Sequence, residues 1–311
     1  MTRPFSWAVF SVLALAAPRP AEAQDYRRTA VPGRPFCVVW PGREYLYRLD
    51  AAGSLRTPGD SEFSAIDAAV ASWRAVSSTC SDYVFTRGPD IHEPQVGYRQ
   101  DGGENENVIT FREVDCNDVV PPDDPCIKAD TCGNAYACWE HGGATIGLTT
   151  TTFSFRTGYI LDADIEFNAA GAGRGFFFTT VDSPPCDGVR DTDCVGTDVQ
   201  NTVTHELGHV VGLDHVPEVP GSTMEPTAHP GETRKRVIDV GSAAGFCDAY
   251  PRGLPPTQCG ENPEVGRHFQ AISYGPWGGC GTVPGSLLPV AALLGVGVVR
   301  RRREGGHSSR Q

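Results

Sequence analysis

The chain has 311 residues, of which 40% are hydrophobic and 21% charged, so it can bury a core and is not a disordered polymer. A formal net charge of −12 excludes a protein that binds nucleic acid through a generally basic surface. Eleven cysteines are typical of an exported protein, and 36 glycines with 25 prolines indicate many turns rather than a helical bundle.

Residues 1–23 are predicted to form a secretory signal peptide. Arg3 supplies the positive start, Phe5 to Ala17 is an apolar run, and Ala21-Glu22-Ala23 fits a small-x-small cleavage site. We therefore expect an exported protein, extracellular or anchored at the cell surface, whose mature chain begins near Gln24.

The body of the chain, residues 24–251, is predicted to be one enzyme-sized domain. A first strand region is expected at 36–50, a helix at 61–77 and short strands at 84–85 and 108–111. The apolar stripe of the helix consists of Phe63, Ile66, Val70 and Trp73.

Two long loops and two further strands follow. The segments 112–143 and 169–197 are expected to be loops, with strands at 146–152 and 159–168 between them. A second helix should start after Asp198, whose side chain can cap it. Its buried face is expected to consist of Val199, Val203, Leu207 and Val210.

The C-terminal region is predicted to be a linker, 252–279, followed by a tail, 280–311. Gly278-Gly279 precede Cys280, where the tail starts, and an apolar run to Val299 and four arginines, Arg300 to Arg303, follow. A helix over 281–299 would span roughly 28 Å. The pattern resembles the MYXO-CTERM sorting tails of myxobacteria, which implies processing near Cys280 by a sorting enzyme and retention at the surface. A plain helix inserted in the membrane is the alternative.

The remaining ten cysteines suit five disulfides in an oxidising compartment. Spacing alone leaves their pairing open. Plausible local pairs are Cys116 with Cys126, Cys132 with Cys138, and Cys186 with Cys194. Cys37 follows Arg34-Pro35-Phe36, and we interpret it as a disulfide partner rather than as a thiol that blocks a metal.

The chemistry is predicted to lie at residues 205–215. On a helix, His205 and His209 are neighbours on one face and can bind one zinc ion. Glu206 lies one residue further round, where it can act as a general base on an activated water. Gly212 lets the chain leave the helix with positive φ, and the turn brings back His215 as a third ligand. Three protein ligands leave a coordination position open, which is the catalytic arrangement.

This motif, followed by Ser222-Thr223-Met224, resembles the metzincin metalloproteases. The resemblance implies that Met224 lies beneath the three histidines. Pro226 stands where astacins and serralysins have a tyrosine, so the chain is more similar to the matrixins. That similarity implies an α/β (α+β) fold with a twisted mixed sheet, two long helices and, after Gly212, a small irregular C-terminal subdomain containing one helix.

The segment Asp162 to Asn168 also resembles the matrixin strand on which the substrate lies. The resemblance implies that an extended substrate would be held by Asp164, Ile165, Glu166, Phe167 and Asn168.

Acidic residues gather around the expected Cys186–Cys194 loop and raise the question of a calcium ion as a second cofactor. They are Asp182, Asp187, Asp191, Asp193 and Asp198. The spacing of an EF-hand is not present, and a solvated acidic loop is the favoured interpretation.

Together these patterns predict an exported, surface-retained zinc endopeptidase that acts on proteins or peptides. One alternative is a zinc-bound adhesion or binding module without turnover, against which Glu206 argues, because binding needs no general base. Another is hydrolysis of a different amide, such as a cell-wall cross-link.

Overall fold

The computed structural model describes residues 26–259 and 277–282, apart from 102, 172, 189 and 190. The expected signal peptide and most of the expected tail lie outside the described residues. Within the described part of the chain, no helix is long and apolar enough to cross a membrane.

A mixed seven-stranded sheet forms the centre of the protein, with strand order β10-β11-β5-β6-β4-β2-β3. Its strands are β2 (Glu44–Leu49), β3 (Val84–Arg87), β4 (Asn107–Arg112), β5 (Thr145–Phe153), β6 (Ile160–Asn168), β10 (Thr227–Ala228) and β11 (Trp277–Thr282). Strands β2, β3, β4 and β6 pair in parallel, whereas β5 runs antiparallel to β6. The expected strand positions at 84–85, 108–111, 146–152 and 159–168 are confirmed.

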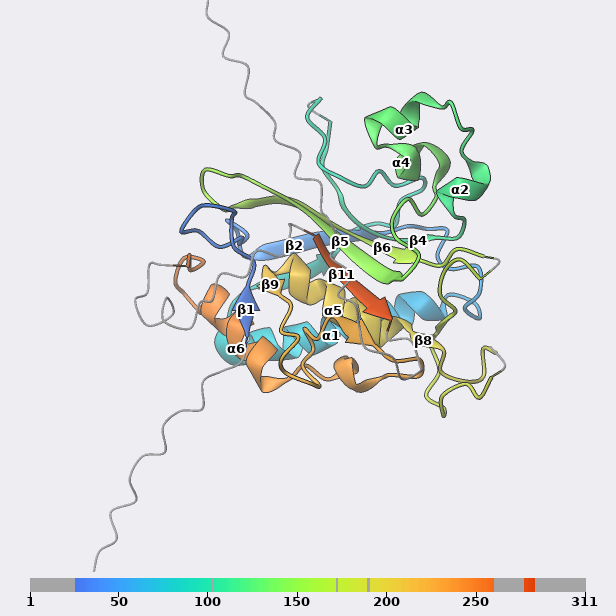
Figure 1. The fold of residues 1–311 in the computed structure, drawn as a ribbon. Helices are drawn as coiled ribbons and strands as arrows, with labels where there is room; N and C mark the ends of the chain where they lie inside the picture. The colour runs from blue at the N-terminus through green and yellow to red at the C-terminus, as the bar shows by residue number, and fades with distance from the viewer. Residues whose placement is uncertain (1–25, 102, 172, 189–190, 260–276, 283–311) are drawn as a thin grey trace, which may run out of the picture.

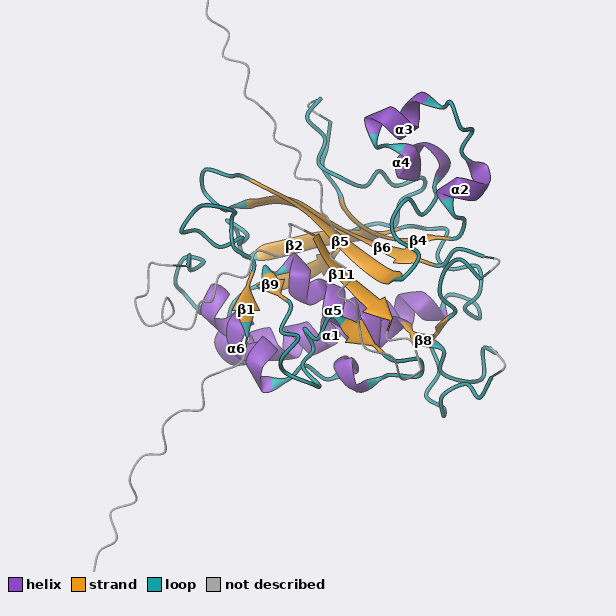
Figure 2. Cartoon of the chain, in the orientation of Figure 1, coloured by secondary structure: helices purple, strands orange, loops and turns teal. Residues whose placement is uncertain are grey.

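Two long helices cover one face of this sheet (Figure 1). They are α1 (Ser61–Cys80) and α5 (Val199–Val210), and α6 (Val240–Ala249) lies beside α1. The secondary-structure view separates the helical layer from the strands (Figure 2). The mixed sheet and its helices confirm the predicted α+β fold class.

The core lies between the sheet and the two helices. On α1, Ile66, Val70 and Trp73 are at most 1% exposed, while Phe63 is half-buried. The indole Nε1–H of Trp73 donates to the carbonyl oxygen of Thr204 on α5, at 2.9 Å. On α5 the four residues expected to be buried are also at most 1% exposed. Each such side chain contributes about 1.5–3 kcal/mol through its removal from water.

The segment expected to be a loop at 112–143 contains three short helices: α2 (Cys116–Val119), α3 (Pro125–Ala129) and α4 (Cys132–Tyr136). Helices of four or five residues are too short to show an apolar period, which is why the sequence pattern misses them. They lie on the side of the sheet away from α1 and α5 (Figure 1).

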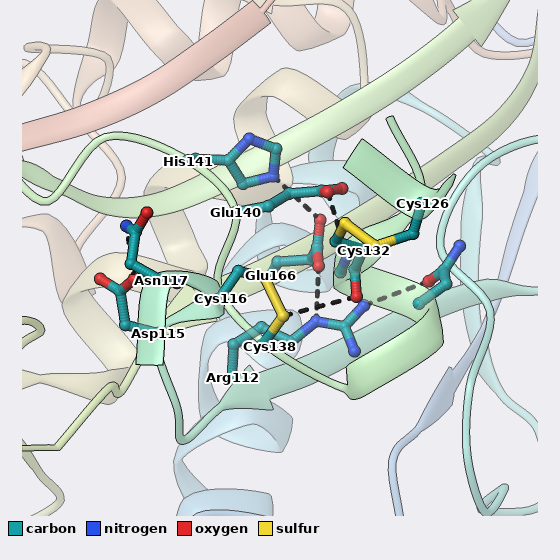
Figure 3. The surroundings of a disulfide bond; sticks show 12 residues. Arg112, Asp115, Cys116, Asn117, Cys126, Cys132, Cys138, Glu140, His141 and Glu166 are labelled. Atoms are coloured by element: carbon teal, nitrogen blue, oxygen red, sulfur yellow. Dashed lines mark hydrogen bonds and ion pairs between the residues drawn. A yellow bond between two sulfur atoms is a disulfide. The ribbon is translucent and has the colours of Figure 1, made fainter. Parts of the chain in front are cut away.

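Two disulfides close this segment, and both expected local pairs are wrong. Cys116 is bonded to Cys138, and Cys126 to Cys132 (Figure 3). The shorter loop is nested inside the longer one, and the four cysteines form a small buried cluster of their own. Spacing along the sequence favours disulfides between consecutive cysteines. In the folded chain, the course of the backbone instead brings the first and last of these four cysteines together.

The other three disulfides are Cys37–Cys259, Cys80–Cys247 and Cys186–Cys194. The last is the expected local pair, and the first confirms Cys37 as a disulfide partner. Gln258 accepts a hydrogen bond from the backbone N–H of Cys37, at 3.1 Å. Residues 252–259 are therefore fastened to the domain rather than starting a free linker at 252.

The shorter elements complete the chain. They are β1 (Arg27–Arg28) paired with β9 (Leu213–Asp214), β7 (Phe178–Thr179) paired with β8 (Thr197–Asp198), and the 3-10 turn η1 (Arg234–Arg236). β7 and β8 flank the acidic part of the segment expected to be a loop at 169–197. β11 crosses the expected boundary between linker and tail at 279–280.

We expect the long-range disulfide between α1 and α6 to stabilise the fold more than the short surface disulfide. Cys80 and Cys247 are 167 residues apart in sequence, against 8 for Cys186 and Cys194. Loop-closure entropy gives about 5 kcal/mol for the first and about 2.5 kcal/mol for the second. Urea unfolding of Cys80→Ala/Cys247→Ala and of Cys186→Ala/Cys194→Ala measures both. An equal loss in the two variants would contradict this account.

Candidate functional site

The helix α5 is fixed at both ends. At its start, the carboxylate of Asp198 caps the helix by accepting the backbone N–H of Asn201 at 2.7 Å, as expected from the sequence. At its end, the indole of Trp40 donates to the carbonyl of Val210 at 2.8 Å. The hydroxyl of Tyr250 donates to the carbonyl of Val211 at 3.1 Å. These contacts satisfy carbonyls that a helix end leaves free.

Gly212 ends the helical path and is required there for two reasons. Its φ is +86°, which side chains disfavour. A Cβ at this position would also lie 2.3 Å from the carbonyl oxygen of Val38. The turn leads into β9 and brings His215 back toward the helix.

The three predicted histidines converge. The Nε2 atoms of His205 and His209 are 3.3 Å apart, those of His205 and His215 are 3.2 Å apart, and those of His209 and His215 are 3.1 Å apart. The Nδ1–H of His205 donates to the carbonyl of Thr223 at 2.6 Å, and that of His209 to the carbonyl of Leu213 at 2.9 Å. These acceptors set the tautomer and leave the Nε2 lone pairs facing one another.

This geometry fits a tetrahedral metal ion. Three nitrogens, each about 2.0–2.1 Å from one such ion, are about 3.3–3.4 Å apart. Burial lowers the pKa of His209 to about 4 and, with the neighbouring histidines, holds the pKa values of His205 and His215 well below the ordinary value. The rings are therefore neutral ligands. Among the described residues, they form the one group of histidine, cysteine and carboxylate side chains that could hold a metal.

Glu206 is fully buried beside the histidines. Its Oε2 accepts a hydrogen bond from the hydroxyl of Thr149 on β5, at 2.7 Å. Its Oε1 has no hydrogen-bond partner among the described residues. Burial raises the pKa of Glu206 to about 8, although the bonds from Thr149 lower it. The carboxylate is thus held by one oxygen while the other remains free for a ligand.

Met224 packs against α5 between the first two histidines. A Cβ built at Gly208 would lie 2.2 Å from its sulfur, so the helix needs glycine there. The backbone N–H of Thr223 donates to the carboxylate of Asp239 at 2.7 Å. Because Thr223 also accepts the bond from His205, Asp239 holds the turn that orients this ring.

Sequence reasoning missed Thr149 and the role of Asp239. Thr149 is one of four consecutive threonines at 149–152, and nothing in that run distinguishes it. Asp239 had a detectable signal, because it precedes a helix and caps it by accepting the N–H groups of Gly241 and Ser242. Its second contact, with Thr223, joins residues that only the fold brings together.

The strand predicted to hold a substrate is placed differently. β6 lies inside the sheet, with its backbone bonded to β4 on one edge and to β5 on the other. Strand addition needs a free edge, so β6 offers none and the expectation for residues 164–168 is wrong in this respect. The resemblance of sequence did not show which strand lies at the edge.

The five residues instead support the sheet. Ile165 and Phe167 belong to the core. Asp164 accepts the N–H groups of Gly97 and Val108, and Asn168 donates to the carbonyl of Thr145.

Glu166 forms a buried ion pair with Arg112 at 2.6 Å and lies 3.4 Å from His141 (Figure 3). Burial raises its pKa, but these two neighbours outweigh burial and keep the pKa below the ordinary value. The ion pair joins β4 to β6, and Arg112 also donates to the side-chain carbonyl of Asn134 in the disulfide-closed segment, at 3.3 Å.

The strand beside the histidines is β5. It contacts α5 through Thr149 and Glu206, and a cavity of about 270 Å³ opens next to it. The cavity is bordered by Ile146 on β5, by Asn201 on α5 and by Ala228 on β10. β5 and α5 therefore contribute both to the surroundings of the histidines and to the border of this cavity.

The acidic residues considered for calcium do not converge. The guanidinium of Arg236 pairs with both Asp182 and Asp198. Asp198 also caps α5, and Asp187 is exposed. Within the described residues no carboxylate cluster meets the geometry of a metal site.

No protein-family model matches the chain, and no curated protein matches it either.

We expect Thr149→Val to lower the free energy of unfolding by about 1.5 kcal/mol, because it removes the hydroxyl that donates to the buried carboxyl group of Glu206. Thr149→Ser keeps the hydroxyl and should restore the stability. Thr151→Val, two residues along the same strand, is the matched control. Urea unfolding measures these effects, and equal midpoints for Thr149→Val and the wild type would contradict the importance of this contact.

We expect Asp162→Asn to stabilise the protein by about 1–2 kcal/mol at pH 8 and to have no effect near pH 4. Burial raises the pKa of Asp162 to about 6. The folded state then binds more protons than the unfolded state between about pH 4 and 6, so the wild type loses stability as pH rises through that window. Urea unfolding at both pH values tests this, with the exposed Asp187→Asn as control. Equal midpoints for Asp162→Asn and wild type at pH 8 would refute it.

Proposed function

We propose that the protein is a zinc-dependent endopeptidase of metzincin type, similar to the matrixins, and that it is exported. The single observation that carries this proposal is the convergence of three buried, neutral imidazoles with one carboxylate beside them. The Nε2 atoms of the histidines lie 3.1–3.3 Å apart, and Glu206 is the neighbouring acid. A structural site would use a fourth protein ligand, whereas three ligands leave a position for a substrate or water.

In the proposed mechanism His205, His209 and His215 hold the metal. When bound, zinc supplies Lewis acidity toward water and toward a peptide carbonyl. Glu206 accepts a proton from the attacking water through its free Oε1 and later donates it to the leaving amine. Thr149 orients this carboxylate through Oε2. Burial raises the pKa of Glu206 in the metal-free site, and a cation held by the three histidines would lower it again, toward the range in which the carboxylate accepts a proton at neutral pH.

The substrate is proposed to be an extended peptide that adds to β5 along the edge that β11 occupies in this structure, so β11 would have to leave first. Backbone hydrogen bonds to β5 give affinity without regard to side chains. The cavity beside Ile146 and Ala228 would receive one substrate side chain. This arrangement favours a peptide over a branched or compact amide.

We expect Glu206→Gln to lower hydrolysis by about 10²–10⁴-fold, because it removes the general base, while one zinc ion stays bound. His209→Asn should lose both zinc and activity. Activity is measured as the rate at which the full-length protein cleaves a proteome-derived peptide library. Elemental analysis gives its zinc content. A chelator should abolish cleavage, and added zinc should restore it.

Two results would refute the proposal. Wild-type protein that binds zinc but cleaves no peptide in the library would be a binding module. Wild-type rates in Glu206→Gln would remove this residue from the reaction.

A further inference from the structure

The edge of β5 carries a segment of the chain's own C-terminal region. β11, residues Trp277–Thr282, lies antiparallel along β5. On its other side β11 pairs in parallel with β10. We call the space between β5 and β10, which β11 occupies, the strand slot. Figure 1 shows β11 crossing the region of α5.

The register sets this segment beside the carboxylate of the proposed site. Cys280 pairs with Gly147, and a Cβ at Gly147 would lie 3.0 Å from Oε1 of Glu206. Gly278 pairs with Thr149, whose hydroxyl binds the same carboxylate. A peptide substrate that adds to β5 next to Glu206 needs these same positions. The segment and a substrate therefore exclude each other.

We propose that residues 277–282 are an internal inhibitor that occupies the strand slot and keeps the enzyme latent until the segment is displaced. This inference rests on the proposed endopeptidase function.

Two features indicate that residues 277–282 would be held at the site rather than cleaved there. Three of the six residues, at 278, 279 and 281, are glycines, so at these positions the segment supplies a backbone ladder and no side chain. The ladder also shifts register between Cys280 and Gly281, next to Gly147. The backbone pairing of the segment is therefore irregular beside Gly147, close to Glu206. A substrate would have to be aligned at this position for reaction.

The expected strength of inhibition follows from the covalent connection between the segment and the rest of the domain. A segment joined to its site through a short connection acts at an effective concentration of about 1 mM. With an affinity of about 0.1 mM, within the usual range for substrates, it would lower turnover about tenfold. The full chain therefore retains measurable activity.

The test uses the full chain with a recognition sequence for a specific protease placed within 260–276. Hydrolysis of a quenched peptide is measured before cutting and after the released fragment is removed. We expect a rise of about tenfold. A synthetic peptide of residues 274–285 should then inhibit competitively, raising KM without changing kcat. The same engineered chain left uncut is the control.

A cross-link tests docking independently of activity. Trp277 pairs with Thr150, and directly opposed strand residues have the Cα separation that a disulfide needs. Thr150→Cys/Trp277→Cys in a Cys280→Ser background should form a disulfide on mild oxidation and stay latent after cutting. Thr152→Cys/Trp277→Cys is the matched control and should not form one, because Thr152 is two residues further along the strand. Mass spectrometry of the cut protein reports both.

The outcomes separate the two proposals. Unchanged peptide hydrolysis after cutting would overturn the inhibitor and leave the endopeptidase standing. Zinc-loaded protein that is inactive both before and after cutting would overturn the endopeptidase, and the inhibitor with it. A missing Thr150–Trp277 cross-link would overturn the docking itself. Cleavage of the untreated chain between 277 and 282 would make the segment a substrate and not an inhibitor.

Discussion

The structure depends on holding three neutral imidazoles with their lone pairs directed at one point. Nε2 atoms 3.1–3.3 Å apart repel one another unless a cation lies among them, so this arrangement must be held by the fold. Two carbonyls, from Thr223 and Leu213, achieve this for two rings by accepting the Nδ1–H bonds. Both carbonyls belong to irregular or two-residue elements that follow α5. The precision of the site therefore rests on the part of the chain with the least regular structure.

That irregular part is stabilised by covalent and polar contacts in place of a sheet or helix ladder. The disulfide Cys80–Cys247 ties α6 to α1, and Cys37–Cys259 ties the end of the segment after α6 to the body of the domain. Asp239 caps α6 and also binds Thr223, so one carboxylate joins the helix to the turn that orients His205. Asp239 is half-buried, and its bonds to Thr223 and Ser242 outweigh its partial burial and hold its pKa below the ordinary value, so these contacts favour its charged form.

The sequence predicted what depends on local spacing. The i, i+4 histidines, the cap at Asp198 and the glycine at 212 are local requirements of one helix, and the structure has them. It did not predict what depends on the order of strands. The alternating acids at 162 and 164 resembled a substrate strand, but an interior strand and an edge strand can carry the same pattern. The nested disulfides of residues 116–138 and the choice of Thr149 among four threonines likewise depend on which segments the fold brings together.

The position of β11 follows from the hazard that an open edge strand presents. The edge of β5 would offer unpaired N–H and C=O groups to any extended chain, and such edges invite aggregation unless they are covered. A strand rich in glycine, supplied from residues 277–282 of the same chain, pairs with this edge and satisfies the backbone of β5. Because β5 also contacts Glu206 through Thr149, the pairing that covers this edge is the same pairing that an extended ligand beside Glu206 would need.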